Sequence, residues 1–388
     1  MKSTRILDGV LAAMILGAIA VTASGQSDSS NAPLEPHGLA PSFPDSVAIE
    51  KRRPTSGSTP ASEKAVDLGL QWLAKQQNAD GSWSFQGNFA NPGKWRSKTG
   101  ATGLVLLPFL GAGQTHTEGK HKATVRNGLN FLIKQMKITP KGGDLRGEGG
   151  EMLWHAMATI ALCEAYDMSR DKILQKPAQY AIDFSCAMQD PASGGWAANS
   201  GEKPSTAVTA WQVMAMKSAY MAYLRVPRAN IKKAPTYFDT VQVDKGARYG
   251  KTSPKTADNT ATAAGLLSRM YLGWKWDNEA LNRGIDYLSE TGPSEKDVVY
   301  NYFGQKVMRH RGEEPWTRWN RSLRDRLVEA QLPQGESIYA GSWFCPDDPN
   351  AAGGGRIFQT AINVMTLEVY YTTFPVPRRH DYDQDFPE

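Results

Sequence analysis

An internal repeat constrains the fold of this chain more than any other feature. Six amphipathic segments recur along it, and the steps between equivalent small residues are 59, 53, 53, 50 and 38 residues, at Gly69, Gly128, Ala181, Ala234, Gly284 and Ser322. A period of this size indicates one stacked supersecondary unit, because a single unit cannot bury its apolar face alone. We therefore expect a repeat architecture over most of the 388 residues.

A second kind of helical segment lies between successive amphipathic segments. These second segments are rich in Ala, Thr, Met and Gly and are apolar nearly all round, which is typical of helices packed on several sides. We expect them to form an inner layer, with the amphipathic segments outside it. Six pairs can close a ring, and the sequence lacks convincing strand alternation. The predicted fold is all-α, an (α/α)6 toroid of six outer and six inner helices.

Most of the outer segments end in Gln and are followed by Gly and an aromatic residue. The clearest cases are Q-Q-N-A-D-G-S-W, Q-D-P-A-S-G-G-W and Q-L-P-Q-G-E-S-I-Y-A-G-S-W, and two more loops are degenerate. Glycine permits a tight reversal, the ring can cover the helix end, and Gln can satisfy backbone groups there. We interpret this pattern as structural.

The first residues predict export. A basic start precedes an apolar run from Gly9 to Ala23, which is too short to span a bilayer comfortably and ends in small residues. We expect a signal peptide at 1–25, a flexible Ser/Pro-rich spacer at 26–60, the toroid at 61–374 and a tail at 375–388. An uncleaved anchor is the alternative. After cleavage we expect no stable transmembrane segment, and a periplasmic, cell-envelope or extracellular location.

Cysteine and charge usage argue against metal and nucleic-acid functions. Cys163 and Cys186 lie in apolar helical contexts, where a buried, unreactive thiol is common. Cys345 has carboxylates nearby but no histidine at metal-site spacing. The net charge is +5, and the basic residues between Arg309 and Arg326 are interleaved with acidic ones, so we expect a mixed surface and no nucleic-acid partner.

The Gln–Gly–Trp loops resemble the QW repeats of squalene-hopene cyclases and their relatives, which share an α/α toroid with protein prenyltransferase β subunits. The closing segment resembles exported bacterial squalene cyclase-like repeat proteins of unassigned activity. This resemblance covers residues 61 to 374 and implies a terpenoid cyclase/prenyltransferase-like toroid. Fold alone does not decide function.

The same resemblance singles out Asp258 as a candidate acid. In the cyclases, an acidic D-x-D-D-T-A motif at an inner-helix start protonates the substrate through its middle aspartate. Here T-A-D-N-T-A keeps that position as Asp258, while Thr256 and Asn259 replace the two companion acids. Protonating an alkene needs a strong acid whose anion is supported by neighbours. The alternative role of Asp258 is a helix cap.

The resemblance also directs attention to aromatic residues of the inner helices. Rings could stabilise carbocations or bind an isoprenoid, and the alternative is ordinary core packing. The candidates are Trp154, Trp211, Tyr300, Tyr302 and Phe303. The prenyltransferase zinc ligands are not matched, because Val299 stands where a cysteine would follow Asp297, and residues 356–371 contain no histidine. We expect neither a metal nor a cofactor.

Other polar residues stand at inner-helix starts. Glu151 and His155 are four residues apart and could form an acid–base pair, while Asp297 precedes Tyr300 in a second candidate group. Capping and first-turn electrostatics are the alternative explanations.

Three functions therefore remain open from the sequence. The first is an enzyme, or a degenerate relative of one, that binds or transforms an isoprenoid-like apolar molecule. The second is a non-catalytic toroid that binds a lipid, a peptide, a partner protein or a second toroid. The third is a glycan-active enzyme, which would need paired carboxylates.

Overall fold

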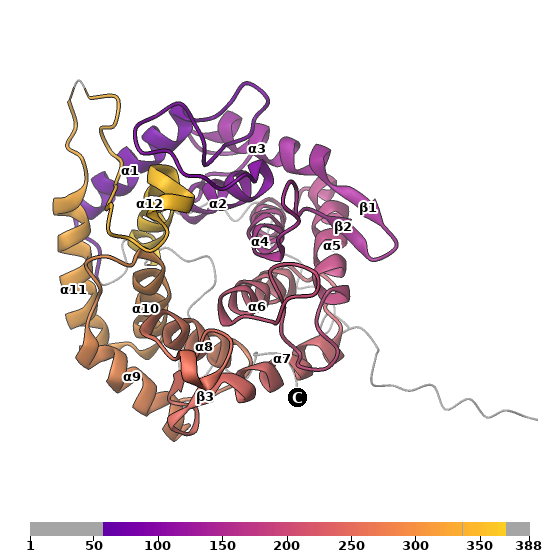
Figure 1. The fold of residues 1–388 in the computed structure, drawn as a ribbon. Coiled ribbons are helices and arrows are strands. Elements are labelled where there is room, and N and C mark those ends of the chain that lie inside the picture. Colours follow the sequence, from indigo (N-terminus) through magenta and orange to yellow (C-terminus); the bar gives the residue numbers. More distant parts are fainter. Residues whose placement is uncertain (1–56, 336, 370–388) are drawn as a thin grey trace, which may run out of the picture.

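The helices of this protein alternate between two concentric layers (Figure 1). The computed structural model describes residues 57–335 and 337–369, and twelve α-helices lie in that part of the chain. The inner helices are α2 (Lys98–Gly111), α4 (Met152–Ser169), α6 (Thr206–Met221), α8 (Asn259–Tyr271), α10 (Val298–Arg311) and α12 (Ala351–Leu367). The outer helices are α1 (Pro60–Lys75), α3 (Lys122–Gln135), α5 (Lys172–Ala187), α7 (Arg228–Val241), α9 (Glu279–Thr291) and α11 (Glu313–Ala330). The predicted all-α toroid is confirmed. The predicted signal peptide, most of the spacer and the tail lie outside the described residues.

The inner helices form a closed ring. Each packs against the next in chain order, and α12 packs against α2. Across this closure Pro92 pairs with Gly355 in an antiparallel bridge, and the guanidinium of Arg356 donates a hydrogen bond to Asn91 Oδ1 at 2.7 Å. First and last repeats are therefore joined through backbone and side chain.

Small residues of the repeat let the two layers approach closely. A Cβ atom at Gly128 of α3 would lie 2.9 Å from Leu106 of α2, and one at Gly284 of α9 would lie 2.7 Å from Leu266 of α8. Both distances are shorter than ordinary carbon–carbon contacts. Gly128 and Gly284, which are equivalent positions of the sequence repeat, thus lie where an outer helix contacts an inner helix.

The Gln–Gly–Trp loops hold consecutive repeats together. Gln77 Nε2 donates to Gly81 O within its own loop and to Thr124 O of the next outer helix, both at 2.9 Å. Gln189 makes the same pair of bonds, to Gly194 and Asn230. Gln331 donates to Gly341 O and reaches back to Ala65 O of α1, both at 2.8 Å. The last loop therefore closes the outer layer.

The degenerate loops differ from a purely helical expectation. Residues after α3 form a hairpin of β1 (Lys137–Thr139) and β2 (Gly142–Asp144), with Ile138 opposite Gly143. Residues after α7 form a smaller hairpin of β3 (Gln242–Val243) and β4 (Arg248–Tyr249). Short antiparallel pairing replaces the Gln–Gly–Trp contacts in these two repeats.

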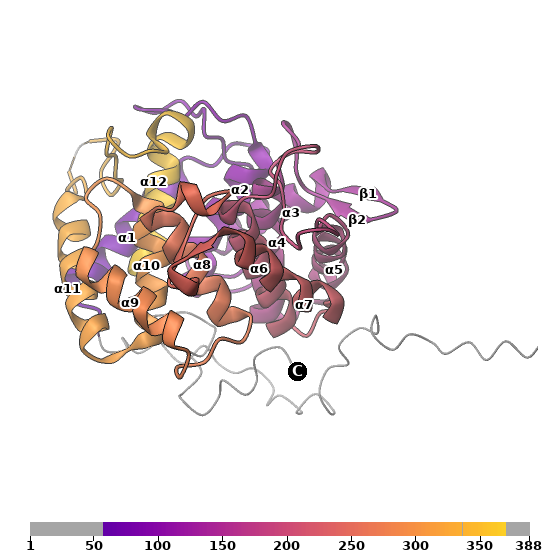
Figure 2. The same cartoon turned by 60° about the horizontal axis from the view of Figure 1, so that its bottom comes forward.

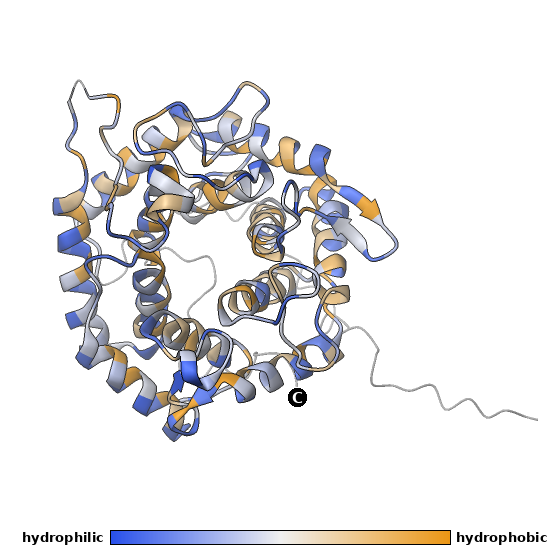
Figure 3. Ribbon diagram, in the orientation of Figure 1, coloured by the Kyte–Doolittle hydropathy of each residue, from blue (hydrophilic) through white to orange (hydrophobic). Residues whose placement is uncertain are grey.

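The two ends of the ring differ. The long loops before α2, α4 and α12 gather at the end where the inner helices begin (Figure 2). Hydrophilic residues run along α10, whereas α4 and α6 are mostly apolar (Figure 3).

Among the described residues, no helix is both long and apolar enough to cross a membrane.

Candidate functional site

Asp258 lies at the start of α8 and has both carboxylate oxygens engaged. Its Oδ1 accepts a hydrogen bond from the backbone N–H of Ala261 at 2.7 Å, which caps the helix. Its Oδ2 lies 3.0 Å from Lys251 Nζ, and the side chain is 35% exposed. The geometry is that of a capping carboxylate with a cationic partner.

Asp297 caps the next inner helix and ties it to α8. Its Oδ1 accepts from Tyr300 N at 2.9 Å, and its Oδ2 accepts from the hydroxyl of Thr260 at 2.6 Å. The hydroxyl of Tyr300 turns away and donates to Gly292 O at 3.0 Å. Asp297 therefore contacts Tyr300 through the backbone N–H of Tyr300, and the phenol hydroxyl bonds elsewhere.

His155 faces the outer layer and does not pair with Glu151. Its Nδ1 accepts from Leu145 N at 3.1 Å, so Nε2 carries the proton, which it donates to Ala181 O at 3.0 Å. The ring is fully buried, and burial lowers the pKa of His155 to about 4. Both nitrogens of a neutral imidazole are therefore used by backbone groups.

The repeat explains this histidine. In four other repeats a threonine hydroxyl accepts from the backbone N–H of the loop aromatic residue. These threonines are Thr102, Thr209, Thr262 and Thr360, which serve Trp83, Trp196, Tyr249 and Trp343. His155 occupies the same position and does the same task. His155 therefore has a structural role.

Glu151 differs from the other carboxylates at this end of the ring. It precedes α4 without a side-chain capping bond, and no described residue makes a hydrogen bond or ion pair with its carboxyl group. Burial, and then the charge of Glu202, raise the pKa of Glu151. Glu202 is held through both oxygens by Asn199, at 3.0 and 3.3 Å. Two carboxyl groups in unlike surroundings thus stand before α4 and α6.

The five candidate aromatic residues fall into three places. Trp154 packs against Gly100 of α2 and lies 5.0 Å, between ring centroids, from Trp95 at the end where the inner helices begin. Tyr300 packs edge-on against Trp319 of α11, between the two layers. The remaining three are Trp211, Tyr302 and Phe303.

These three rings meet inside the ring of helices. Trp211 stacks on Tyr302 with centroids 5.7 Å apart and planes 10° apart, and Trp211 lies 5.6 Å from Phe303. Trp211 belongs to α6 and the other two to α10, which are separated by α8 in the ring. The contact must therefore pass across the inner face of α8. We call these three residues the interior aromatic wall.

The charged residues that are buried near the ends of the inner helices were not identified from the sequence. Lys217 of α6 and Lys306 of α10 are 9% and 8% exposed, and Glu368 after α12 is 3% exposed. Lys306 Nζ lies 5.3 Å from the ring centroid of Tyr302, so this charge adjoins the interior aromatic wall. Glu164 of α4 acts electrostatically on Lys306, although α4 and α10 are opposite each other in the ring. In the sequence, Lys217 is a single charged residue in an otherwise apolar segment end, whereas Lys306 belongs to the basic end K-V-M-R-H-R of α10.

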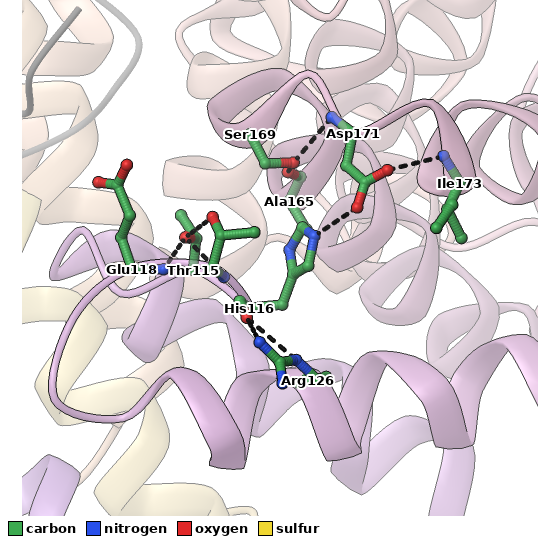
Figure 4. A network of polar contacts seen from close by, with 9 residues as sticks. Thr115, His116, Glu118, Arg126, Ala165, Ser169, Asp171 and Ile173 are labelled. Carbon is green, nitrogen blue, oxygen red and sulfur yellow. Dashed lines mark hydrogen bonds and ion pairs between the residues drawn. The ribbon is translucent and has the colours of Figure 1, made fainter. Parts of the chain in front are cut away.

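A separate polar network outside the ring interior holds loops in place (Figure 4). His116 Nε2 lies 2.9 Å from Asp171 Oδ2, and Asp171 Oδ1 accepts from Ile173 N at 2.9 Å. The guanidinium of Arg126 donates to His116 O. The network joins the loop after α2 to the start of α5, which is a structural role.

The outer surface carries a groove of about 520 Å³ beside the β1–β2 hairpin. It is lined by residues that include Ile138, Tyr180, Cys186 and Arg225, and none of the sequence-predicted site residues contributes to it.

The three cysteines are free thiols, and burial raises the pKa of Cys186 to about 12. In the described part of the chain, no three His, Cys, Asp or Glu side chains are grouped as metal ligands.

Comparison with known proteins supports the fold and leaves the activity open. No protein-family model and no curated protein matches the chain. It is similar to the type II terpene cyclase MstE from Scytonema, with 14% identity, a TM-score of 0.57, and coverage of 79% of this chain and 97% of that one. It is similar to the GH76A alpha-1,6-mannanase from Salegentibacter sp. HEL1_6, with 10% identity, a TM-score of 0.57, and coverage of 80% and 98%.

An alpha-amylase from Clostridium perfringens is also similar, with 12% identity, a TM-score of 0.52, and coverage of 79% and 97%. Toroids that act on terpenoids and toroids that act on glycans thus share this architecture. At these identities the similarity establishes the α/α toroid and no particular family.

Proposed function

We propose that this toroid binds an isoprenoid-like molecule inside its ring, with the chain of the ligand against the interior aromatic wall. The observation that carries the proposal is the meeting of Trp211, Tyr302 and Phe303 across the inner face of α8. The three rings are only 1 to 3% exposed, so they form a packed apolar cluster, and a hydrocarbon chain would reach it by parting the side chains that cover it. MstE, a toroid of the same fold, was solved with geranylgeranyl dihydroxybenzoate, which supports this ligand class.

Binding is a better proposal than cyclisation. The residue in the position of the cyclase acid, Asp258, is paired with Lys251 and caps its own helix. A cyclase interior is also expected to be apolar, whereas this one buries Lys217, Lys306 and Glu368. An amphiphilic ligand suits such an interior better than a pure hydrocarbon does.

Equilibrium dialysis with geranylgeraniol tests the proposal. We expect Trp211→Leu and Tyr302→Leu each to weaken binding about tenfold, since loss of a stacked ring costs roughly 1 kcal/mol or more. Tyr302→Phe keeps the ring and should bind nearly as well as the wild type. Ile138→Ala, in the outer groove, is the matched control. Failure of the wild type to bind, or equal binding by the leucine variants, would refute the proposal.

A glycan-active enzyme is the second candidate, favoured by Glu151 and Glu202. A carboxyl group with a raised pKa suits a general acid, and a solvated carboxylate nearby suits a base or nucleophile. Release of reducing ends from neutral and anionic glycans would be measured for the wild type, Glu151→Gln and Glu202→Gln. Activity lost in both variants supports this candidate, and an inactive wild type removes it.

Export is also part of the proposed function. It rests on the apolar run from Gly9 to Ala23, which lies outside the described residues. Mass spectrometry of the mature N-terminus from the source cells would test it, with cleavage near residue 25 expected. An intact N-terminus found in the cytoplasm would contradict it.

A further inference from the structure

The outer groove beside the β1–β2 hairpin is an accessible surface that the proposed function does not use. Its volume of about 520 Å³ falls within the range of roughly 300 to 1,000 Å³ that is typical of ligand pockets. Ile138 of β1 lines it and is 64% exposed, and Tyr180 of α5 and Pro227 before α7 also line it. Covering these side chains with another apolar group would remove apolar surface from water, which is favourable.

Basic side chains surround this groove. Lys141 and Arg225 line it. Lys176 Nζ lies 5.4 Å from the ring centroid of Tyr180. The acidic residue of the lining is Asp183, which lies 3.4 Å from Arg225. Among the described residues, no carboxylate pairs with Lys141 or Lys176, so these two ammonium groups can each accept an acidic partner.

The end of the sequence has the complementary composition. Residues 381–388 read D-Y-D-Q-D-F-P-E, with four acids, two aromatic residues and no basic residue, and they lie outside the described residues. In an extended segment, alternate side chains point to opposite faces. Tyr382 and Phe386 would then enter the groove together, while the aspartates stay at its mouth within reach of the long lysine side chains.

The connecting segment is long enough to reach the groove. Arg225 follows α6 and Val369 follows α12, so both lie at the end of the ring where the inner helices end. These two helices are opposite each other. With roughly 10 Å between neighbouring helix axes, opposite axes are about 20 Å apart, and the outer layer adds about another 10 Å. The eleven residues 370–380 can span about 36 to 40 Å when extended.

We propose that residues 381–388 dock in the outer groove of their own chain. The two aromatic rings pack against Ile138 and Tyr180, and the acids pair with Lys141 and Lys176. Attachment to the same chain gives an effective concentration on the order of millimolar, so weak contacts suffice. This inference is independent of the proposed function, because the groove lies on the outer surface of the toroid.

Zero-length cross-linking of the full-length protein tests this placement. A carbodiimide joins a lysine amine to a carboxyl group in contact with it, and peptide mass spectrometry identifies the joined pair. We expect links from Lys141 and Lys176 to residues 381–388 about tenfold above those from Lys94. Lys94 is the control, because it is exposed and lies in the loop before α2, at the end of the ring where the inner helices begin.

Full-length variants separate docking from attraction between charges alone. Tyr382→Ser combined with Phe386→Ser removes both rings and keeps every acid, so the links to Lys141 should fall about tenfold. Ile138→Ser should also reduce them. Ile173→Ser is its matched control, since Ile173 is 74% exposed and lies outside the groove, and it should leave the links unchanged.

Cross-linking of heavy-isotope chains mixed with an equal amount of unlabelled chains identifies the source of the docked segment. Links within one isotope that the serine variants lose support the proposal. Links that join the two isotopes would place the segment of a second copy in the groove and overturn docking within one chain. Links that persist in the serine variants, links spread over exposed lysines such as Lys94, or no links at all would also overturn it.

Discussion

His155 shows how one residue can look catalytic in the sequence and be structural in the fold. It accepts a backbone N–H in the position where threonines do so in four other repeats, and its second nitrogen donates to Ala181 O. His155→Ala leaves Leu145 N–H and Ala181 C=O unpaired beside a cavity, which should cost about 3 kcal/mol of unfolding free energy. His155→Thr should cost less, because threonine can still accept from Leu145. Guanidinium denaturation of both variants checks this, and equal losses would contradict it.

The same residue should make stability depend on pH. Burial lowers the pKa of His155 to about 4 from its usual 6.5, so the unfolded chain binds more protons in that interval. Stability should therefore fall as pH falls from about 6.5 towards 4. His155→Thr should remove part of this slope, while His310, whose pKa is lowered to about 3, retains the rest. An unchanged slope in melting temperature against pH would count against this account.

Glu151 should show the opposite sign. Because burial and Glu202 raise its pKa, the folded chain holds this proton more tightly, and the stability associated with it is lost as pH rises from near 4.5 through the raised value. Glu151→Gln should raise the melting temperature at pH 8 and change it little at pH 4. A difference independent of pH would show that the substitution acts through packing alone.

At the scale of elements, close approach of helices depends on glycine. A Cβ atom at Gly103 of α2 would lie 2.5 Å from the backbone nitrogen of Ala158 in α4, and backbone cannot yield as a flexible side chain can. Gly103→Ala should therefore destabilise the protein by roughly 3 kcal/mol or more, despite the better helix propensity of alanine. Gly335, whose added Cβ would meet no atom within 4 Å, provides the control. Similar denaturation midpoints for the two variants would contradict the prediction.

The helices were predictable from the sequence because their patterns are local. Apolar periodicity identified all six pairs, and the alternation of amphipathic and apolar segments identified their layers. The two hairpins were not predicted, since their strands are only two or three residues long and show no alternation. Apolar periodicity also did not predict the direction in which individual side chains point. Tyr300 and Tyr302 are two residues apart on one helix, yet one faces α11 and the other faces Trp211.

The candidate site was predictable only in part, because it depends on which residues the closed ring brings together. Trp211 and Tyr302 were named from the sequence, but their stacking requires α6 and α10 to flank α8. Lys306 and Glu164 come from opposite helices, and no spacing in the sequence relates them. Lys217 was overlooked because it is a single charged residue in a mostly apolar segment, and Lys306 because it belongs to the basic end K-V-M-R-H-R of its segment, which is typical of an exposed helix end.

For the whole molecule, closure of the ring should make unfolding cooperative. Gln331 bonds α1 to the last loop as Gln77 bonds α3 to the first. Gln331→Ala and Gln77→Ala should each cost about 1 to 3 kcal/mol, because each leaves two carbonyl groups without that donor. Both variants should still unfold in one calorimetric transition. A separate early transition in Gln331→Ala alone would show that the first and last repeats open independently.

The most direct test of ligand binding inside the ring is a crystal structure of the full-length protein grown with geranylgeraniol. We expect ligand density inside the ring along Trp211 and Tyr302, with the hydroxyl end towards Lys306 and Glu164. Density confined to the outer groove beside Ile138, or ligand bound only near Glu151 and Glu202, would contradict it.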